Sequence, residues 1–274
     1  MDLGKGFYQI PVSSKDIEKT ELVTHKGLFE FLTMPFGLCN ALAATFQRLM
    51  FGVLKGLRGK ECLSYMDDIL IFGRNELECL ARLRRVFSRL RHTDLKVKPS
   101  KCIFFRREVT FLGQEVSAAG VRPDREKVRV VREWPVPGTV REMQSFLGLV
   151  NYFVRYIKDY AEVAAPLYEK TRAGSGSTRI TVDAVELKHF ERLKSALAEL
   201  PLLSHPRLDQ PFTLQADASK TAIGSVCLQR QPDGLQRPIA FFSRKLDAAQ
   251  QNNSNYKREC LAVVHAMHHC RVFL

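Results

Sequence analysis

Two adjacent aspartates, Asp67 and Asp68, interrupt an otherwise apolar stretch of sequence, C-L-S-Y-M-D-D-I-L-I-F-G, at residues 62–73. Neighbouring carboxylates repel each other unless a cation or a proton offsets their charge. The β-forming residues on both sides predict two strands joined by a tight turn at the acidic pair. The pair is therefore either a solvated turn or half of a metal site.

A third carboxylate, Asp2, begins another strand-like segment, D-L-G-K-G-F-Y-Q-I. If Asp2 meets Asp67 and Asp68 in the fold, the three carboxylates would bind two Mg²⁺ ions, because Mg²⁺ prefers oxygen ligands and completes its shell with water and phosphate. Such ions can activate a 3′-hydroxyl and stabilise a leaving pyrophosphate.

The net charge of +13 indicates a polyanionic partner, and nucleic acid is favoured over a membrane surface. Much of the charge lies between residues 82 and 107, where Asp94 is the single acidic residue. The basic residues of this segment are Arg82, Arg84, Arg85, Arg89, Arg91, Lys96, Lys98, Lys101, Arg106 and Arg107. The segment is either a phosphate-contacting surface or, in its first half, a solvated helix face.

The sequence contains no apolar run long enough to span a membrane and does not begin with a signal peptide, so we expect an intracellular chain, cytoplasmic or nuclear. Seven cysteines without a C-x-x-C pair indicate reduced thiols. A group of metal-type residues lies in one predicted helix, where the spacing scatters side chains around the axis and disfavours a shared metal. The group comprises Cys260, His265, His268, His269 and Cys270.

Periodicity and capping signals predict the elements that would position these residues. The expected elements are a helix near 43–57, a hairpin over 62–72, an amphipathic helix over 76–92, a hairpin over 102–117, a helix over 140–157, a linker over 171–179, a helix near 185–200, strands over 212–217, 222–230 and 237–243, and a helix over 255–271. The aromatic residues of the 140–157 helix are predicted to lie in the core rather than to stack on bases. They are Phe146, Tyr152, Phe153 and Tyr156.

Five motifs occur in order along the chain: D-L-G-K-G-F-Y-Q-I (2–10), G-L-F-E-F-L-T-M-P-F-G-L-C-N-A-L-A-A-T-F-Q-R-L-M (27–50), Y-M-D-D-I-L-I-F-G (65–73), F-L-G-Q-E-V-S-A-A-G-V (111–121) and S-F-L-G-L-V-N-Y-F-V-R-Y-I (145–157). The series closely resembles the reverse transcriptases of gypsy-type LTR retrotransposons. The resemblance implies an α+β fold, a reverse-transcriptase palm with thumb and connection followed by a partial ribonuclease H-like mixed α/β domain. The implied domains are the palm at 1–120 with its fingers mostly missing, thumb or connection helices and linker at 121–178, and a connection helix with a truncated ribonuclease H-like domain at 179–274.

By this resemblance Asp2 and Asp67 are the main ligands of two Mg²⁺ ions in a nucleotidyl transferase, and Asp68 assists them. Phe7 falls at a position that would exclude a 2′-hydroxyl, although a strand-core Phe is the alternative. The other implied substrate-binding residues are Gln9, which matches the motif, the nucleotide-pocket residues Pro35, Phe36 and Gly37, Met66 at the primer end, and Phe111, Leu112 and Gly113, which resemble the primer grip.

The C-terminal part resembles the start of a ribonuclease H domain, in which Asp217 and Glu259 would help to hold two metals that hydrolyse RNA in a hybrid. The implied partners are an RNA or DNA template with its primer, an RNA–DNA hybrid, deoxynucleoside triphosphates and possible other Pol segments. The chain stops at Leu274, before the third acidic residue of this domain in the family, so we expect an incomplete ribonuclease H metal site.

Two further departures from the family bear on the polymerase site. Almost nothing precedes Asp2, so we expect its strand to be frayed. The segment N-A-L-A-A-T-F carries an extra residue, which would rotate the start of the following helix by roughly 100°. Three hypotheses follow: a reverse-transcriptase fragment, a catalytically inactive nucleic-acid-binding remnant, and the product of a decaying element that folds poorly.

Overall fold

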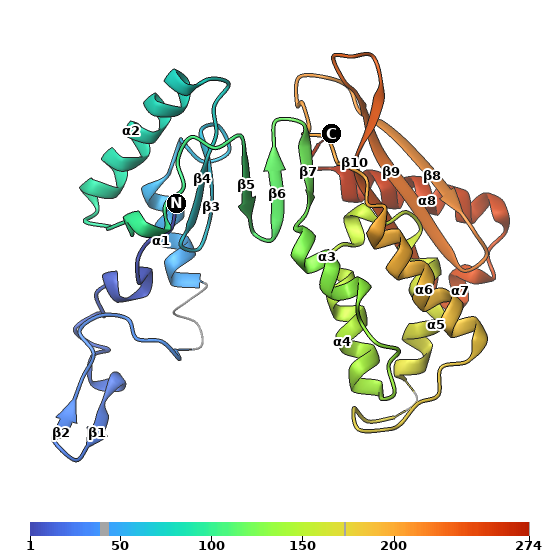
Figure 1. Ribbon diagram of the computed structural model, residues 1–274, viewed down its shortest axis with the longest axis horizontal. Coiled ribbons are helices and arrows are strands. Elements are labelled where there is room, and N and C mark those ends of the chain that lie inside the picture. The colour runs from blue at the N-terminus through green and yellow to red at the C-terminus, as the bar shows by residue number, and fades with distance from the viewer. Residues whose placement is uncertain (39–43, 173, 274) are drawn as a thin grey trace. The chain divides into compact units, whose positions relative to one another are not determined.

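The structure is a computed structural model that describes residues 1–38, 44–172 and 174–273 (Figure 1). The chain forms two compact units, Met1–Arg107 and Glu108–Leu274. The sequence placed the first boundary near residue 120 and a second near 178. These domain boundaries stay predictions, and each of the two units is described by itself.

The first unit is built from short strands and two helices. Its elements are β1 (Leu22–Thr24), β2 (Gly27–Phe29), α1 (Phe46–Val53), β3 (Cys62–Tyr65), β4 (Asp68–Ile71) and α2 (Glu76–His92), with 3-10 turns at Gly6–Gln9, Glu18–Thr20 and Pro99–Lys101. The hairpin of β3 and β4 and the helix α2 lie where the sequence predicted them. The hairpin of β1 and β2 was not predicted.

Buried and more exposed side chains alternate along β3, and in β4 Ile69 is buried. The buried side chains Cys62, Ser64 and Ile69 hold one face of the hairpin against the core. The two strands pair antiparallel from Cys62 with Ile71 to Tyr65 with Asp68. Buried side chains of α1 and the residue after it, of α2, and of the segment before the first 3-10 turn complete this core. They include Leu3, Phe46, Met50, Leu54, Val86 and Leu90.

Helix α2 begins at Glu76, as predicted, and Asn75 caps it. The Asn75 side chain accepts a hydrogen bond from the Glu78 amide at 2.9 Å. The Glu78 carboxylate does not return to Asn75 but accepts from the Arg74 amide at 2.7 Å. The cap satisfies one of the free amides at the start of the helix.

The second unit combines helices with two three-stranded antiparallel sheets (Figure 1). Its elements are β5 (Glu108–Phe111), β6 (Gln114–Ser117), β7 (Gly120–Pro123), α3 (Arg125–Arg132), α4 (Val140–Asn151), α5 (Tyr160–Thr171), α6 (Ala184–Ala198), β8 (Thr213–Ala218), β9 (Ala222–Arg230), β10 (Gln236–Lys245), α7 (Ala248–Gln251) and α8 (Asn255–Cys270), with a 3-10 turn at Val154–Tyr156. Helix α8 packs against β8 and β9, and α5 packs against β9 and β10. The three strands predicted over 212–243 and the final helix are confirmed with small shifts at their ends, whereas the hairpin predicted over 102–117 begins later, at Glu108.

Helices α4, α5 and α6 share one core, in which the rings of Phe146 and Phe190 lie 4.5 Å apart between centroids. The predicted helix over 140–157 ends earlier, at Asn151, and a 3-10 turn follows it. Phe146, Phe153 and Tyr156 are buried as predicted. The prediction was wrong for Tyr152, which is 40% exposed.

The Gly- and Ser-rich segment that composition assigned to a linker is hydrogen-bonded to the start of α4. The Val140 amide donates to the Thr178 carbonyl at 3.0 Å, and the Arg141 amide donates to Gly176 at 2.9 Å. The Ile180 amide in turn donates to Gly138 at 3.0 Å. These bonds tie the segment to the helical core, an arrangement that composition does not reveal.

In the described ranges, no helix combines the length and the apolar character that crossing a membrane would require.

We predict that Asp183→Ala lowers the free energy of unfolding of the second unit by about 1 kcal/mol. Asp183 caps α6 by accepting hydrogen bonds from the amides of Val185 and Glu186, both at 2.8 Å, and the Glu186 carboxylate accepts from the Asp183 amide at 2.9 Å. Urea unfolding followed by circular dichroism measures the change. Asp209→Ala is the matched control, because Asp209 is exposed and caps no helix; equal losses in both variants would contradict the assignment.

Candidate active site

The structure brings Asp2 next to Asp68 through the backbone. Residues 1–3 run antiparallel beside β4, with a bridge between Asp2 and Asp68. The Leu3 amide donates to the Asp67 carbonyl at 3.1 Å, and the Ile69 amide donates to Met1 at 2.8 Å. On the other side the Lys98 amide donates to the Asp2 carbonyl at 3.0 Å. The Asp2 segment is thus held along both edges, and the expectation that it would be frayed is not met.

A strained turn joins the two strands at the acidic pair. Met66 adopts a left-handed backbone conformation with φ 49°, which costs a non-glycine residue about 1–3 kcal/mol. The Gln47 side chain, from α1, accepts a hydrogen bond from the Met66 amide at 2.7 Å. Sequence reasoning missed this role of Gln47, although the residue lies within one of the quoted motifs. Gln47 therefore helps to fix the turn that carries Asp67.

The negative charge of the site is partly compensated. Burial, followed by the charges of Asp67 and Asp2, raises the pKa of the Asp68 carboxyl above its ordinary value. Lys101 opposes this shift, and its Nζ lies 3.2 Å from Oδ2 of Asp2. Ionisation of Asp68 is therefore less favourable in the folded chain than in a free aspartate.

The donor set of the three aspartates fits a hard divalent cation, since carboxylate oxygens are the ligands that Mg²⁺ prefers. The raised pKa of Asp68 is the result expected where carboxylates gather at a site that a cation would neutralise. Within residues 1–38, 44–172 and 174–273, however, no three His, Cys, Asp or Glu side chains are arranged to hold an ion. The three aspartates are suitable metal ligands by residue type and by backbone position. Their side chains do not converge on one point in this conformation.

Phe7 lies in the 3-10 turn after Asp2 and not in a strand. Its ring packs edge-on against Phe46, 5.2 Å away between centroids, and against Phe36 at 5.4 Å. Phe36 is exposed, whereas Pro35 beside it is buried. Gly37 follows with φ 97°, a conformation that favours glycine. Phe7 thus joins the core to an exposed aromatic surface.

The side chain of Gln9 is engaged by the backbone. Its Nε2 donates to the carbonyls of Gly4 at 2.8 Å and Lys96 at 3.0 Å, and its Oε1 accepts from the Lys96 amide at 2.6 Å. Gln9 therefore fastens the 3-10 turn to the segment that carries Lys98. The extra residue of the N-A-L-A-A-T-F segment cannot be placed in the same way, because residues 39–43 lie outside the described ranges.

Phe111, Leu112 and Gly113 belong to the second unit. Leu112 and Gly113 form the turn between β5 and β6, with φ 50° and 67°. The Tyr152 hydroxyl donates a hydrogen bond to the Leu112 carbonyl. The segment is therefore a supported hairpin turn.

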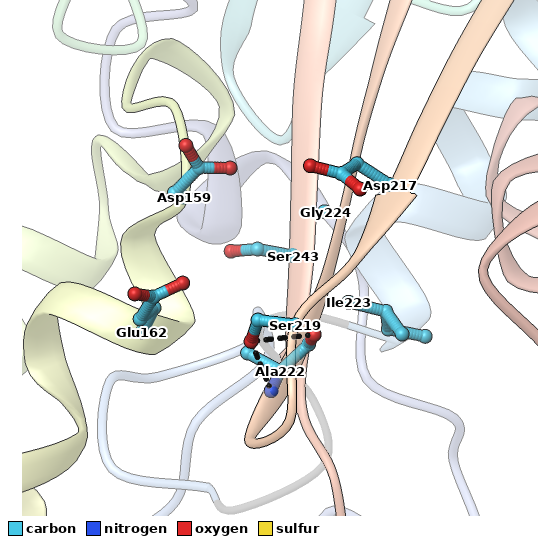
Figure 2. Close-up of a pocket in the computed structure, with 8 residues that line it drawn as sticks. All are labelled: Asp159, Glu162, Asp217, Ser219, Ala222, Ile223, Gly224 and Ser243. Carbon is cyan, nitrogen blue, oxygen red and sulfur yellow. Dashed lines mark hydrogen bonds between the residues drawn. The ribbon is translucent and has the colours of Figure 1, made fainter. Parts of the chain in front are cut away.

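Asp217 lies near the end of β8 and Glu259 lies on α8, two elements that pack together. Figure 2 shows Asp217 in a polar pocket, where its carboxylate faces Asp159 across Ser243. Glu162 from α5 also lines this pocket, and Glu259 is not among its lining residues. Gly224 allows Asp159 to approach, because a Cβ there would lie 2.8 Å from Oδ1 of Asp159. No sequence motif pointed to Asp159 or Glu162.

The other candidate groups are distributed as follows. In the basic segment Arg82 pairs with Glu78 and Arg85 pairs with Glu61, at 2.6 and 2.7 Å. The other basic residues of the 82–107 segment are exposed. On α8, His265 and His269 lie with their Nε2 atoms 3.1 Å apart, Cys270 is buried and Cys260 is exposed.

Solved structures of other proteins identify the fold. Two solved structures of the foamy viral protease-reverse transcriptase share the fold, with TM-scores of 0.85 for the complex with RNA/DNA hybrid and 0.88 for the dRH form with double-stranded DNA. Each is 24% identical and covers 99% of this chain, which corresponds to 36% and 47% of those chains. The chain thus has a reverse-transcriptase fold with a ribonuclease H-like region.

Sequence comparison gives the family. Residues 1–116 match the family described as reverse transcriptase (RNA-dependent DNA polymerase), and residues 183–274 match the RNase H-like domain found in reverse transcriptase. The Pol polyproteins of the Drosophila melanogaster transposons opus and gypsy are 39% and 37% identical over the whole chain, and the Tf2-3 polyprotein of Schizosaccharomyces pombe is 30% identical. The chain belongs to the reverse transcriptase and ribonuclease H region of gypsy-type Pol polyproteins. It spans 28%, 27% and 20% of the length of these three relatives.

We predict that Asp68→Asn stabilises the chain at neutral pH in the absence of divalent cations. Because the folded pKa of Asp68 lies above its ordinary value, ionising it costs folding free energy, and this cost grows as pH rises through the raised pKa. The variant should melt at a higher temperature than the wild type near pH 7, and the difference should shrink near pH 4.

Asp94→Asn is the matched control, because Asp94 is exposed and its φ of 54° is tolerated by asparagine. A melting temperature for Asp68→Asn at pH 7 equal to or below that of the wild type would contradict the folding cost assigned to burial and to the neighbouring carboxylates.

Proposed function

We propose that this chain provides the catalytic palm of an RNA-directed DNA polymerase, which extends a primer with deoxynucleotides on an RNA or DNA template. One observation carries the proposal: the antiparallel pairing of Asp2 with Asp68 beside the Met66–Asp67 turn. This pairing sets the backbones of two distant acidic motifs side by side. The family to which the chain belongs supports the same activity.

In this proposal Asp2 and Asp67 are the main ligands of two Mg²⁺ ions, and Asp68 assists them. When bound, the ions would supply the positive charge that activates the primer 3′-hydroxyl and offsets the leaving pyrophosphate. The protein holds the ligands through the backbone bonds of residues 1–3, and Gln47 fixes the turn before Asp67. Lys101 supplies a fixed positive charge beside Asp2.

The incoming deoxynucleoside triphosphate would lie against Phe7 and the 35–37 segment. Gly37 lacks a Cβ and so permits close approach of the backbone, and exposed Phe36 offers an aromatic edge beside Phe7. Met66 would face the primer end. Phe7 would then exclude a ribose 2′-hydroxyl by its bulk.

The template and primer would contact the exposed basic residues of the 82–107 segment, since phosphates dominate nucleic-acid affinity. The solved structures of similar fold were determined in complex with an RNA/DNA hybrid and with double-stranded DNA, which supports such a partner here. Asp217 and Glu259 would contribute to a ribonuclease H site for the same hybrid. Other segments of a Pol polyprotein are further proposed partners.

A second candidate function is nucleic-acid binding without chemistry. Two observations favour it: Lys101 contacts Asp2, and the three aspartates are not preset as a ligand cage among the described residues. This function keeps the exposed basic residues and needs no metal. It predicts salt-dependent binding that is unchanged in Asp67→Asn.

We predict Mg²⁺-dependent primer extension on an RNA template by the 274-residue chain, reduced roughly a hundredfold or more in Asp67→Asn. The reason is that the substitution removes a charged metal ligand and leaves the shape of the turn. Gel-resolved extension measures the rate, with Asp94→Asn as the control. Equal extension by wild type and Asp67→Asn, or extension by neither, would overturn the catalytic proposal and leave the binding function.

We also predict that Phe7→Val admits ribonucleotides. Removing the ring should lower the preference for deoxynucleotides over ribonucleotides, expressed as a ratio of kcat/KM values, by roughly tenfold or more. Tyr8→Val is the matched control, because the Tyr8 ring also lies edge-on to Phe36, at 5.2 Å. If the preference for deoxynucleotides is unchanged in Phe7→Val, or changes equally in Tyr8→Val, Phe7 does not select the sugar and serves only in packing.

A further inference from the structure

Two histidine side chains on α8 lie against each other in the second unit. The Nε2 atoms of His265 and His269 are 3.1 Å apart, and the centroids of the two rings are 4.3 Å apart. The residues are four positions apart, which places their side chains one above the other on the same face of an α-helix. Neither histidine has a part in the proposed polymerase.

The histidine pair belongs to a larger group of metal-type residues on this helix, which the structure separates. Cys270 is buried in a cluster with Cys227 and Ile239, and Cys260 is exposed. In the part of the chain that the structure describes, no set of three His, Cys, Asp or Glu side chains is arranged around an ion. The pair is therefore a candidate for a site with two protein ligands, in which water completes the shell of the ion.

The distance between the two nitrogen atoms suits a metal ion placed between them. Imidazole nitrogen binds zinc at about 2.0–2.1 Å. Two nitrogens 3.1 Å apart would therefore subtend an angle of about 100° at such an ion, between the square-planar and the tetrahedral values. The pair is thus already spaced for binding through both rings.

Side chains of β10 pack on the pair and affect its charge. The Phe242 ring stacks on His269, at 5.3 Å between centroids, and so helps to orient it. Burial, followed by the charges of His269 and Arg244, lowers the pKa of His265 to about 4, and burial also lowers the pKa of His269. Both rings are therefore neutral at pH 7, and neutral imidazole is the form that binds a metal.

The surroundings favour a transition-metal ion over Mg²⁺. In the described ranges no carboxylate completes a site with the pair, and the positive charge of Arg244 acts on His265. This charge opposes an ion held by charge alone, whereas Zn²⁺, Ni²⁺ and Cu²⁺ form strong bonds to imidazole nitrogen. The pair also lacks the glutamate of the hydrolytic H-E-x-x-H motif, because Ala266 follows His265. The arrangement therefore supports metal binding without hydrolysis.

We propose that His265 and His269 form a binding site for a divalent transition-metal ion such as Zn²⁺. In the metal-free chain, one ring donates its Nε2–H to Nε2 of the other. On binding, this proton moves to Nδ1 of the same ring, so that both Nε2 lone pairs bind the ion and both rings stay neutral. The ion would link two successive turns of α8. The inference does not depend on the proposed polymerisation and gives the chain a second kind of ion.

The test uses the reduced 274-residue chain with isotope-labelled histidine, to which Zn²⁺ is added in excess Mg²⁺. Long-range proton–nitrogen NMR spectra follow the ring nitrogens of each histidine, so they distinguish binding by histidine from binding by thiols or carboxylates. The variants are His265→Gln and His269→Gln. His268→Gln is the matched control, because His268 is an exposed histidine of the same helix.

We expect Zn²⁺ to shift the Nε2 signals of His265 and His269 together until they saturate, and Mg²⁺ to shift neither signal. In each variant of the pair, the remaining histidine should bind Zn²⁺ roughly tenfold or more weakly, because the advantage of two ligands held together is lost. His268→Gln should bind Zn²⁺ as the wild type does. Melting curves followed by circular dichroism check that each variant folds.

Nε2 signals of the pair that stay unmoved in the wild type at excess Zn²⁺ would overturn the inference, and this result needs no variant. A shift confined to one of the two histidines would overturn it as well, since the ion would then have one protein ligand. An equal loss of Zn²⁺ affinity in His268→Gln would also contradict the assignment.

Discussion

The pairing of residues 1–3 with β4 is the constraint on which the candidate polymerase site depends. One backbone bridge places Asp2 beside Asp68, and the adjoining hydrogen bonds satisfy the peptide groups on both sides of it. A shift of this pairing by one residue would turn the Asp2 side chain to the opposite face. Leu3 prevents such a shift, because it is fully buried in the core with Phe46 and Ile69. The hydrophobic core thereby fixes the register of a charged site.

The same arrangement carries an electrostatic cost. Burial and the neighbouring carboxylates raise the pKa of Asp68, and Met66 holds a strained backbone beside it. Lys101 and the Gln47 side chain offset part of these costs. The buried carboxyl and the strained turn destabilise the fold locally, and the hydrophobic core under the hairpin offsets this destabilisation. Such a balance is expected at a site that accepts cations.

Local sequence patterns were enough to predict the elements that carry the acidic residues. The β-forming residues on both sides of the acidic pair predicted the β3–β4 hairpin. Asn75 and the helical spacing of the leucines predicted α2. Both signals lie within a few residues of the structure that they predict. Partners distant in sequence could not be predicted. β7 pairs with Leu203, Gln9 bonds to Lys96, and Tyr152 reaches Leu112, so each role depends on the assembled fold. The hydrogen bonds between the predicted 171–179 linker and the start of α4 are a further example, because composition does not reveal them.

The most direct test of the account is to map where a bound ion lies along the chain. Fe²⁺ with ascorbate, in the presence of a terminated primer–template and nucleotide, cleaves the backbone next to the ion it replaces. The account predicts cuts near Asp2, near Asp67 and Asp68, and in the adjoining segment at Lys98, all suppressed by excess Mg²⁺ and by Asp67→Asn. Cleavage confined to one of these segments, or cleavage that Mg²⁺ does not suppress, would contradict the claim that they form one metal site.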